Sequence, residues 1–328
     1  MVDLDAEPGP ELRRGLFETG FFLLRDHVIP RQLLDDIRDK TLAFMALPDE
    51  QKSAYRGTLR GWAPFRSESA TAGYGDGEAG EGDACQKYSM GPIVTAEMRA
   101  ANPAYYNDPD AALYLTDNIF PDDELREVWE EYYRRMEQLC SRLLETIVGI
   151  LGLPPGAWDK QTSAPVSVMR FLDYPDLAGG IRMGAHYDDT LLTVLHQSVP
   201  ENNFAGLQVM LPGESQWRSI PPRDDVFVVN VGETLTYMSG SHIKATKHRV
   251  IAPPPEKSQG SARSSIGYFY LPNWNARLWP ADVEGMDANL GKHAKNFNFD
   301  ELLEPDGSVL FYKSQRRAIE KLVGKKDE

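Results

Sequence analysis

Two of the six histidines in the chain belong to a pattern that could bind a metal ion. His186 and Asp188 form an H-x-D motif, and His248 follows sixty residues after Asp188. Two imidazoles and one carboxylate make a facial triad. Such a triad leaves coordination positions open on a non-haem Fe(II) ion, as chemistry with O₂ requires. An H-x-D motif alone is weak evidence, so its neighbours in the sequence matter.

A candidate carboxylate-binding pair follows the second histidine. Arg263 and Ser265 stand at the start of the apolar run Ile266–Leu271, fifteen residues after His248. Residues two apart on a strand point to the same face. An arginine can hold a carboxylate through two parallel hydrogen bonds, and a serine hydroxyl can add another. Together the two motifs predict a metal centre beside a carboxylate site.

The other histidines compete with this assignment. By spacing alone His242, six residues before His248, could be the third ligand. His196 lies in a strand-like run and is expected to be a half-buried, hydrogen-bonded histidine, whereas His27 and His293 fall in surface or loop sequence. Asp189, beside the H-x-D motif, is expected to support the ligands or to form a turn.

The residues after Pro165 are expected to form the β core that positions these groups. Turn residues separate short apolar runs, and no helical pattern lies between them, which favours a sandwich or barrel over parallel βαβ units. The predicted strands are Val166–Phe171, Thr190–Leu195, Leu207–Leu211, Asp225–Val231, Thr234–Met238, His248–Ile251 and Ser264–Leu271.

The first 160 residues are expected to be mainly helical. A short helix near Glu11–Glu18 precedes a strand at Phe21–Leu24, and a helix is predicted at Arg31–Leu47. Pro121 and the acids after it begin a long helix, which Gly152 ends. Its apolar stripe predicts a scaffold helix that braces the β core. We expect one catalytic unit made of residues 1–160, a core at 161–280 and a helical tail at 281–328.

A glycine-rich segment, Arg66–Cys85, interrupts the helical region. It holds five glycines and few apolar residues, so it buries little and is expected to be mobile. It could be a plain surface insertion or a lid over a pocket. Cys85 at its end could be exposed, whereas Cys140 is expected in the core. Two cysteines cannot make a disulfide framework or a four-thiolate zinc site.

Several stretches resemble the isopenicillin N synthase-like family of Fe(II) oxygenases, most of which use 2-oxoglutarate. The likeness covers roughly residues 15–275. The matching stretches are Gly20–Leu24, Arg182–Asp188, Leu192–Gln197, Gly206–Val209, Val228–Gly232, Lys247–Val250 and Arg263-x-Ser265. Shorter stretches resemble the bacterial cephalosporin ring-expanding synthases, namely Arg60–Trp62, Ser67–Thr71 and Tyr88–Gly91.

The resemblance implies a distorted double-stranded β-helix, or jelly roll, with an N-terminal helical layer and a C-terminal helix. It also implies Fe(II) with 2-oxoglutarate and O₂ as co-substrates. His186, Asp188 and His248 would be the iron ligands, since the family's ligand directly precedes an Arg-Val pair. The family pattern places the distal carboxylate of 2-oxoglutarate on Arg263 and Ser265, and Tyr174 matches a tyrosine that helps to hold the co-substrate in some members.

One position departs from the family pattern. Leu172 stands where several relatives carry a polar residue near the other end of 2-oxoglutarate. Arg170 lies two residues earlier on the same strand face and could compensate. Because the family's carboxylate ligand is present as Asp188, no position is vacant for a halide, and halogenation is not expected.

The implied activity is oxidative decarboxylation of 2-oxoglutarate to succinate and CO₂, coupled to hydroxylation, desaturation or ring rearrangement of a substrate. A small carboxylate-bearing molecule of bacterial secondary metabolism is expected, with expandase-like β-lactam chemistry as the sharpest version. The candidate substrate pocket combines aromatic and cationic side chains: Arg60, Trp62, Phe65, Met183, Tyr270 and Asn273.

Two alternatives remain open from the sequence. An oxidase of the same fold could use Arg263 and Ser265 for its own substrate's carboxylate, without 2-oxoglutarate. A jelly-roll binding protein without chemistry is the second alternative. The net charge of −14 argues against nucleic-acid or anionic-membrane partners. The chain shows no signal-peptide pattern and no apolar run of membrane-spanning length, so a cytoplasmic location is expected.

Overall fold

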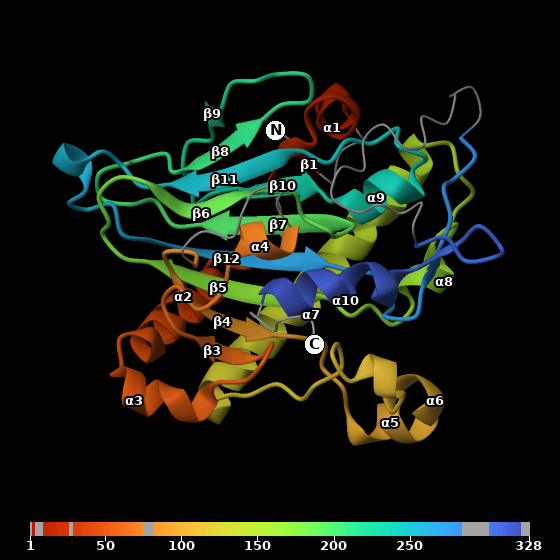
Figure 1. Ribbon diagram of the computed structural model, residues 1–328, viewed down its shortest axis with the longest axis horizontal. Helices are drawn as coiled ribbons and strands as arrows, with labels where there is room; N and C mark the ends of the chain where they lie inside the picture. Colours follow the sequence, from red (N-terminus) through yellow and green to blue (C-terminus); the bar gives the residue numbers. More distant parts are fainter. Residues whose placement is uncertain (1, 4–8, 26–28, 75–81, 284–301, 323–328) are drawn as a thin grey trace.

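The core of the protein is formed by two β-sheets (Figure 1). The computed structural model describes residues 2–3, 9–25, 29–74, 82–283 and 302–322, with the backbone alone at 73–74 and 317–322. The larger sheet has eight strands in the order β1-β2-β10-β7-β12-β5-β4-β3. Their bounds are β1 Val2–Asp3, β2 Phe21–Arg25, β10 Phe227–Val231, β7 Leu192–Gln197, β12 Arg263–Tyr270, β5 Val168–Tyr174, β4 Gln86–Met90 and β3 Gly61–Ala63.

The smaller sheet has four strands in the order β6-β11-β8-β9. Its strands are β6 Ile181–His186, β11 Lys247–Ile251, β8 Leu207–Met210 and β9 Arg218–Ser219. All pairs in this sheet are antiparallel, and β6 and β11 are joined with an irregular register. A third, two-stranded ribbon pairs β13 (Arg277–Leu278) with β14 (Val309–Leu310).

Strand alternation gives the larger sheet two different faces. On β10, Phe227, Val229 and Val231 join the main hydrophobic core, whereas Val228 joins a smaller cluster with Leu207 of β8. The smaller cluster also takes side chains from β5 and β11, so it fills the space between the two sheets. The chain therefore forms a double-stranded β-helix sandwich, as the sequence predicted, with an inner face between its sheets.

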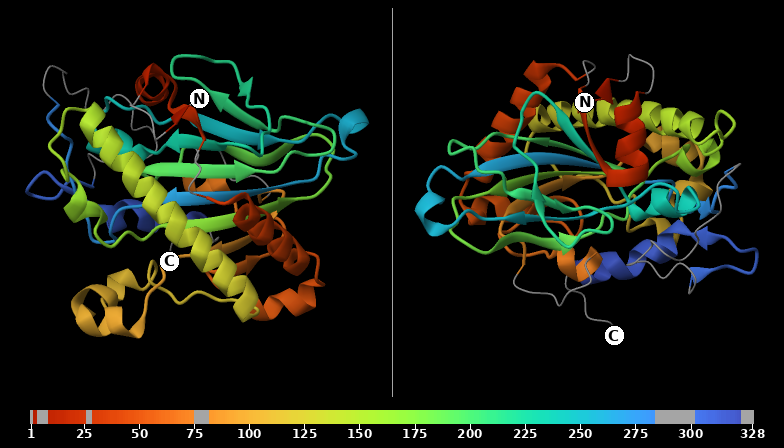
Figure 2. Two further views of the ribbon diagram at one scale, coloured as in Figure 1. Left: turned by 180° about the vertical axis from the view of Figure 1, so that it is seen from behind. Right: turned by 90° about the horizontal axis from the view of Figure 1, so that it is seen from above.

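Two helices cover the outer face of the larger sheet. α7 (Asp123–Ile150) crosses behind the strands, beside α2 (Arg31–Met45) (Figure 2). The Asp122 carboxylate caps α7 by accepting from the Leu125 amide. The apolar stripe of α7 is buried along its whole length, as expected of a scaffold helix. In the part of the chain that is described, no helix is both long and apolar enough to cross a membrane.

The remaining helices are short, except α10. α4 (Ala70–Tyr74) and α10 (Phe311–Leu322) lie side by side in front of the sheets, although they are far apart in the sequence (Figure 1). The others are α1 Pro10–Arg14, α3 Asp49–Lys52, α5 Ala96–Ala101, α6 Pro103–Tyr106, α8 Asp159–Thr162 and α9 Glu233–Met238.

One strand prediction was wrong, and two other local features were not anticipated from the sequence. The segment Thr234–Met238, predicted as a strand, belongs to α9, because a fully buried helix lacks the polar face that distinguishes it from a buried strand. The helical region also contributes β3 and β4, which extend the larger sheet. Cys85, which by its place in the sequence could be exposed, is buried, because it packs in the cluster between the sheets.

Candidate active site

The three predicted metal ligands converge between the sheets. His186 ends β6 and lies directly opposite His248 on β11 in the antiparallel register, and Asp188 follows two residues after β6. Their candidate ligand atoms all lie within 4.8 Å of one another. Asp188 Oδ1 is 3.5 Å from His186 Nε2 and 3.6 Å from His248 Nε2. His242, the rival by spacing, is not part of this cluster.

In both histidines the ring nitrogen that faces away from the cluster already has a hydrogen-bond partner. His186 Nδ1 lies 2.8 Å from the Gly184 carbonyl, and His248 Nδ1 lies 3.2 Å from the Thr246 carbonyl. A ring that donates Nδ1–H to a carbonyl keeps the Nε2 lone pair free for a metal.

The carboxylate is oriented in the same way. Asp188 Oδ2 accepts from the Thr193 hydroxyl at 2.6 Å and from the Asn230 amide at 2.7 Å. These donors come from β7 and β10, adjacent strands of the larger sheet. Because Oδ2 is occupied, Oδ1 remains to face the two imidazoles.

Burial and mutual charge set the protonation of the three groups. Burial lowers the pKa of His248 to about 4, and the charge of His186 adds to the effect. Burial would also lower the pKa of His186, but the hydrogen bond and charge of Asp188 outweigh it and raise that pKa. Burial would raise the pKa of Asp188, yet the two histidines and Thr193 hold it well below its usual range. The site therefore favours an ionised carboxylate and a neutral His248, both suited to ligate a cation.

Arg263 is buried at the inner face without an acidic partner. It donates to Gln197 Oε1 at 3.2 Å and lies 5.3 Å above the Tyr174 ring, its cross-strand neighbour. Its Nε has no hydrogen-bond partner, and among the described residues the ionisable groups that act on it are Tyr174 and Cys85, not a carboxylate. Burial lowers the pKa of its guanidinium. Ser265, two residues on, is buried on the same face. A buried guanidinium without an acidic partner is suited to bind the carboxylate of a small-molecule ligand.

Known proteins share this sequence pattern. Residues 164–272 match the 2OG-Fe(II) oxygenase superfamily, and residues 5–109 match the N-terminal region of the non-haem dioxygenases in morphine synthesis. The chain is 30% identical to the homoarginine-6-hydroxylase 2-ODD-C23 of Glycine max, over 92% of this chain and 87% of that relative. The chain belongs to the 2OG-Fe(II) oxygenase superfamily.

Further relatives align with most of the length of this oxygenase. The deacetoxycephalosporin C synthase of Amycolatopsis lactamdurans is 27% identical and covers 89% of this chain and 88% of that enzyme. A 2OG-Fe(II) oxygenase family protein from Caulobacter crescentus has the same fold, with a TM-score of 0.69 at 23% identity. That alignment covers 91% of this chain and 88% of the other.

Superfamily members use Fe(II), 2-oxoglutarate and O₂, and the groups of this oxygenase fit them. Two imidazole nitrogens and one carboxylate oxygen are the donor set of non-haem Fe(II) oxygenases. The unpaired Arg263 fits the carboxylate of a co-substrate. When bound, the iron and 2-oxoglutarate supply the activation of O₂. The contribution of the chain is to orient the donors and to bury the site away from water.

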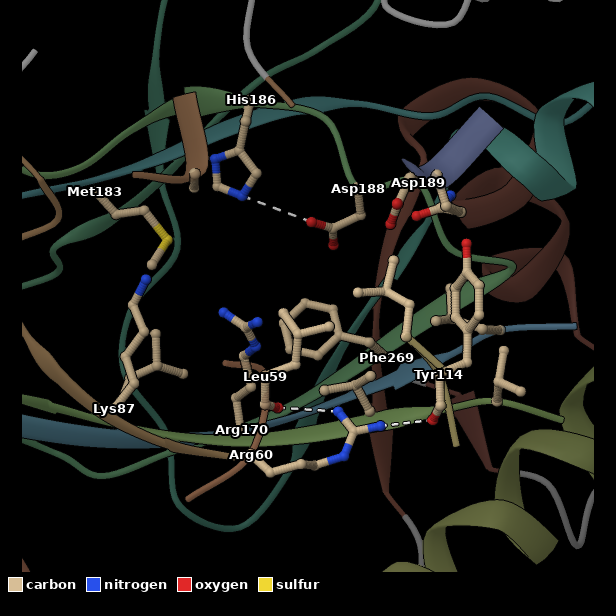
Figure 3. Close-up of a pocket in the computed structure, with 17 residues that line it drawn as sticks. Leu59, Arg60, Lys87, Tyr114, Arg170, Met183, His186, Asp188, Asp189 and Phe269 are labelled. Carbon is tan, nitrogen blue, oxygen red and sulfur yellow. Dashed lines mark hydrogen bonds and ion pairs between the residues drawn. The ribbon is translucent and has the colours of Figure 1, made fainter. Parts of the chain in front are cut away.

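A cavity of about 110 Å³ opens beside His186 and Asp188 (Figure 3). Most of its wall is apolar and comes from Leu59, Ala70, Leu113, Val166, Val168, Leu172, Met183, Phe269 and Leu271. The polar residues of the wall are Arg60, Lys87, Tyr114, Arg170, Asp189 and Gln315. An apolar cavity with a few polar groups is typical of a small-molecule site.

The charges on one side of the cavity neutralise one another. Glu68 lies 2.8 Å from the Arg170 guanidinium and 3.2 Å from the Lys87 ammonium, which also lies 2.9 Å from Asp83. Burial would raise the pKa of Glu68, but Arg170 and Lys87 outweigh it and lower that pKa. Arg170, predicted as a contact of the co-substrate, thus faces the cavity with an internal counterion.

Arg60 also lines the cavity, as predicted, and is almost completely buried. Its guanidinium donates to the carbonyls of Leu59 at 2.9 Å and Tyr114 at 2.7 Å (Figure 3). Burial lowers its pKa to about 10, and its Nε has no hydrogen-bond partner. Met183 is the other predicted substrate contact that the structure brings to the cavity.

Four predicted substrate contacts lie elsewhere. Trp62 is buried and donates to Gln86, while Phe65 is largely exposed to solvent. Tyr270 faces the main core beyond the larger sheet, and Asn273 fixes a turn through bonds to Ala164, Lys160 and Ser163. Trp62 and Tyr270 alternate to the other face of their strands, which is why a motif near the site did not place them in it.

Four polar residues of the cavity, among them Tyr114, were not predicted as part of it from the sequence. Lys87 comes from β4, and its role could have been inferred only from the pairing of β4 with β5. Asp189, expected as a support or turn residue, lines the cavity. Burial, and then the charge of Asp188, raise the pKa of Asp189 to about 7. Gln315 comes from α10, and nothing in the sequence marked it.

The predicted lid at Arg66–Cys85 is described only at its two ends, because residues 75–81 lie outside the described part of the chain. The first end packs closely on β6, where a Cβ at Gly184 would collide with the Thr71 hydroxyl. The Ala70 amide donates to Asp83 Oδ2 at 3.0 Å and joins the two ends. The lid itself stays a prediction.

Proposed function

We propose that this 2-oxoglutarate-dependent oxygenase holds Fe(II) with His186, Asp188 and His248 and oxidises a small carboxylate-bearing molecule. The distal carboxylate of 2-oxoglutarate is assigned to Arg263 and Ser265, with Tyr174 beneath the guanidinium. The observation that carries this assignment is the buried guanidinium of Arg263, which lacks an acidic partner among the described residues. Leaving such a charge unpaired is costly unless an anion completes it.

Arg170 is assigned to the opposite end of the co-substrate, nearer the metal. It lines the cavity together with His186 and Asp188, and it lies on the same strand face as Leu172 and Tyr174. Its charge is balanced by Glu68, so its contact with the co-substrate is expected to contribute less than that of Arg263.

The substrate is assigned to the apolar part of the cavity, with its carboxylate toward Arg60. That side chain is buried, charged and without an acidic partner in the described chain. Met183 packs beside the metal ligands and would contact the substrate's body. The reaction would be a hydroxylation, a desaturation or a ring expansion. These three reactions share their first step, the loss of a hydrogen atom from the substrate.

We further propose that the enzyme belongs to the isopenicillin N synthase-like branch and acts in bacterial secondary metabolism. The similarity to a deacetoxycephalosporin C synthase, over most of both chains, supports antibiotic-type chemistry. The net charge of −14 supports a small-molecule partner over a nucleic-acid or anionic-membrane partner.

A turnover screen tests this function. The purified enzyme with Fe(II), 2-oxoglutarate and O₂ is offered candidate carboxylate metabolites, and succinate is measured together with the oxidised product. One succinate for each product is expected, and the Asp188→Ala variant serves as the inactive control. Substrate oxidised without succinate would instead support the oxidase that uses no 2-oxoglutarate. Fe(II) that fails to bind would support a non-catalytic binding protein.

A further inference from the structure

A groove with a volume of about 720 Å³ runs along helix α7, outside the active-site cavity. Tyr133, Glu137 and Ser141 of α7 form one side of this α7 groove, and Met98 of α5 and Tyr106 of α6 form the other. Figure 1 shows α5 and α6 together, apart from the two sheets. No described residue lines both the α7 groove and the cavity beside the metal ligands. Its volume is that of a site for a small organic molecule.

Glu137 is the only acid among the described residues that line the α7 groove. On a helix, a glutamate finds its counterion three or four residues away. Arg134, three residues earlier, already lies 2.7 Å from Glu130. The residues four before and four after Glu137 are Tyr133 and Ser141, which carry no positive charge. The helix therefore presents the Glu137 carboxylate to the groove without a partner of its own.

Nothing in the described part of the chain compensates this carboxylate. Burial alone raises the pKa of Glu137, and no cation or hydrogen-bond donor offsets the effect. Arg142 also lines the groove, but it lies five residues further along α7 and does not act on Glu137. The charge of Glu137 does reach the rings beside it, because after burial it is the next cause that raises the pKa of Tyr106 and of Tyr133. Removing a carboxylate from water is unfavourable unless a cation or a donor replaces the water.

The aromatic side chains of the groove are held in place by the protein. The Tyr105 hydroxyl donates to the Ala164 carbonyl at 2.7 Å, and the Tyr133 hydroxyl donates to the Ser167 carbonyl at 3.0 Å. The ring centroids of Tyr105 and Tyr106 lie 4.9 Å apart, with the planes at 81°. Rings fixed beside an unpaired carboxylate attract an organic cation, because the face of an aromatic ring is electronegative.

We propose that the α7 groove binds a primary organic ammonium ion, whose charge pairs with Glu137 and whose apolar body packs on the facing wall. Much of the remaining lining is apolar and comes from Pro92, Ile93, Val94, Leu115, Ala164 and Pro165. A metal ion would need several oxygen ligands, and the groove offers a single carboxylate. A neutral apolar molecule would cover Glu137 and leave its charge unpaired. Because the groove is separate from the metal site, the inference does not depend on the proposed function.

Two matched probes test the inference. They are 2-phenylethylammonium and 2-phenylethanol, in which a neutral hydroxyl replaces the ammonium on the same apolar body. Dissociation constants are measured by calorimetry at neutral pH on the full chain, first without metal and then with Fe(II) and 2-oxoglutarate under anaerobic conditions. The ammonium should bind at least about tenfold more tightly than the alcohol, and equally well in both samples.

Three variants locate the bound ammonium. Glu137→Gln keeps the shape but removes the charge, so it should weaken the ammonium about tenfold and bring the two probes to similar affinities. Glu130→Gln makes the same change on the same helix outside the groove, and should leave both affinities unchanged. Tyr106→Leu removes one ring and should weaken the ammonium about threefold. It decides the matter if Glu137→Gln does not fold.

Several results would overturn the inference. Equal affinity for the two probes, or binding of neither, would show that the groove does not select a cation. Ammonium affinity that is unchanged in both Glu137→Gln and Tyr106→Leu would place the amine elsewhere. Binding that appears only with Fe(II) and 2-oxoglutarate would place it in the active-site cavity. Binding that appears only after Lys325→Gln and Lys326→Gln are combined would show that the chain itself supplies the cation.

Discussion

Two arginines on the inner face of the larger sheet are buried in opposite electrostatic states. Arg263 on β12 has the neutral Gln197 as its hydrogen-bond partner, whereas Arg170 on β5 lies 2.8 Å from the Glu68 carboxylate. A buried charge is stable only when a counterion or a full set of hydrogen bonds compensates it. The difference shows that the chain itself compensates Arg170, and it is the basis of our proposal that a ligand compensates Arg263.

The three metal ligands should be the most sensitive positions. His248→Ala should abolish both Fe(II) binding and turnover, and His186→Ala and Asp188→Ala should do the same, since each removes one of three donors. His242→Ala is the matched control and should retain bound iron, measured by metal analysis after dialysis. Iron that survives the loss of His248 but disappears with His242 would reverse the ligand assignment.

The arginines themselves provide the second test. Arg263→Lys keeps the charge but loses the planar pair of donors, so KM for 2-oxoglutarate should rise by roughly ten- to a hundredfold. Arg170→Lys should raise it only about threefold, since Glu68 already balances that charge. Steady-state succinate formation measures both. Equal increases of KM for 2-oxoglutarate in the two variants would contradict the proposal that Arg263 contributes more than Arg170 to binding the co-substrate. An unchanged value in Arg263→Lys, with a raised KM for the main substrate, would favour the oxidase.

The donors to the metal carboxylate should have a smaller effect. Asn230→Leu removes the amide that holds Asp188 Oδ2 at 2.7 Å, so affinity for Fe(II) should fall about tenfold. Competition with a chelator under anaerobic conditions measures this affinity. Asn202→Leu, at an exposed amide bonded to the Lys257 carbonyl, is the control and should leave the affinity unchanged. An unchanged affinity in Asn230→Leu would show that the carboxylate is oriented without it.

The counterion of Arg170 should affect stability more than chemistry. Glu68→Gln should lower the free energy of unfolding at neutral pH by about 1–2 kcal/mol, because Arg170 loses its partner while Lys87 keeps Asp83. The pKa of Glu68 is lowered in the folded state, so its contribution is present above the unfolded value and is lost as pH falls below it. Urea unfolding at pH 7, 5 and 4 should therefore show the wild-type advantage shrinking below about pH 4.3. If the difference in free energy of unfolding between wild type and Glu68→Gln did not change with pH, the ion pair would not be its cause.

The sequence predicted the groups whose spacing is fixed by strand geometry. Arg263 and Ser265 share a face because side chains alternate along a strand, and the apolar stripe of α7 was visible at helical spacing. The H-x-D motif and His248 were placed together by family resemblance, and the register of β6 with β11 brings them face to face.

The remaining features depend on how distant segments meet. Lys87 reaches the cavity only because β4 joins the sheet beside β5, and Gln315 only because α10 returns to α4. Neither contact has a local signal in the sequence. Tyr270 and Trp62 were expected near the site from their motifs, but alternation turns both side chains away from the cavity. Helix α9 was taken for a strand because its threonines alternate with larger side chains, as in a strand, and because all of its residues are buried, which leaves no exposed polar face to mark a helix.

The alternation along the central strands has a consequence for how such an enzyme can change. On β12 the odd-numbered positions Arg263 and Ser265 face the proposed co-substrate site, whereas Ile266 and Tyr268 belong to the core beneath the helices. A mutation at an inner position can alter which molecules are accepted without disturbing the packing that keeps the chain folded. Catalytic preference and fold can therefore evolve nearly independently within a single strand.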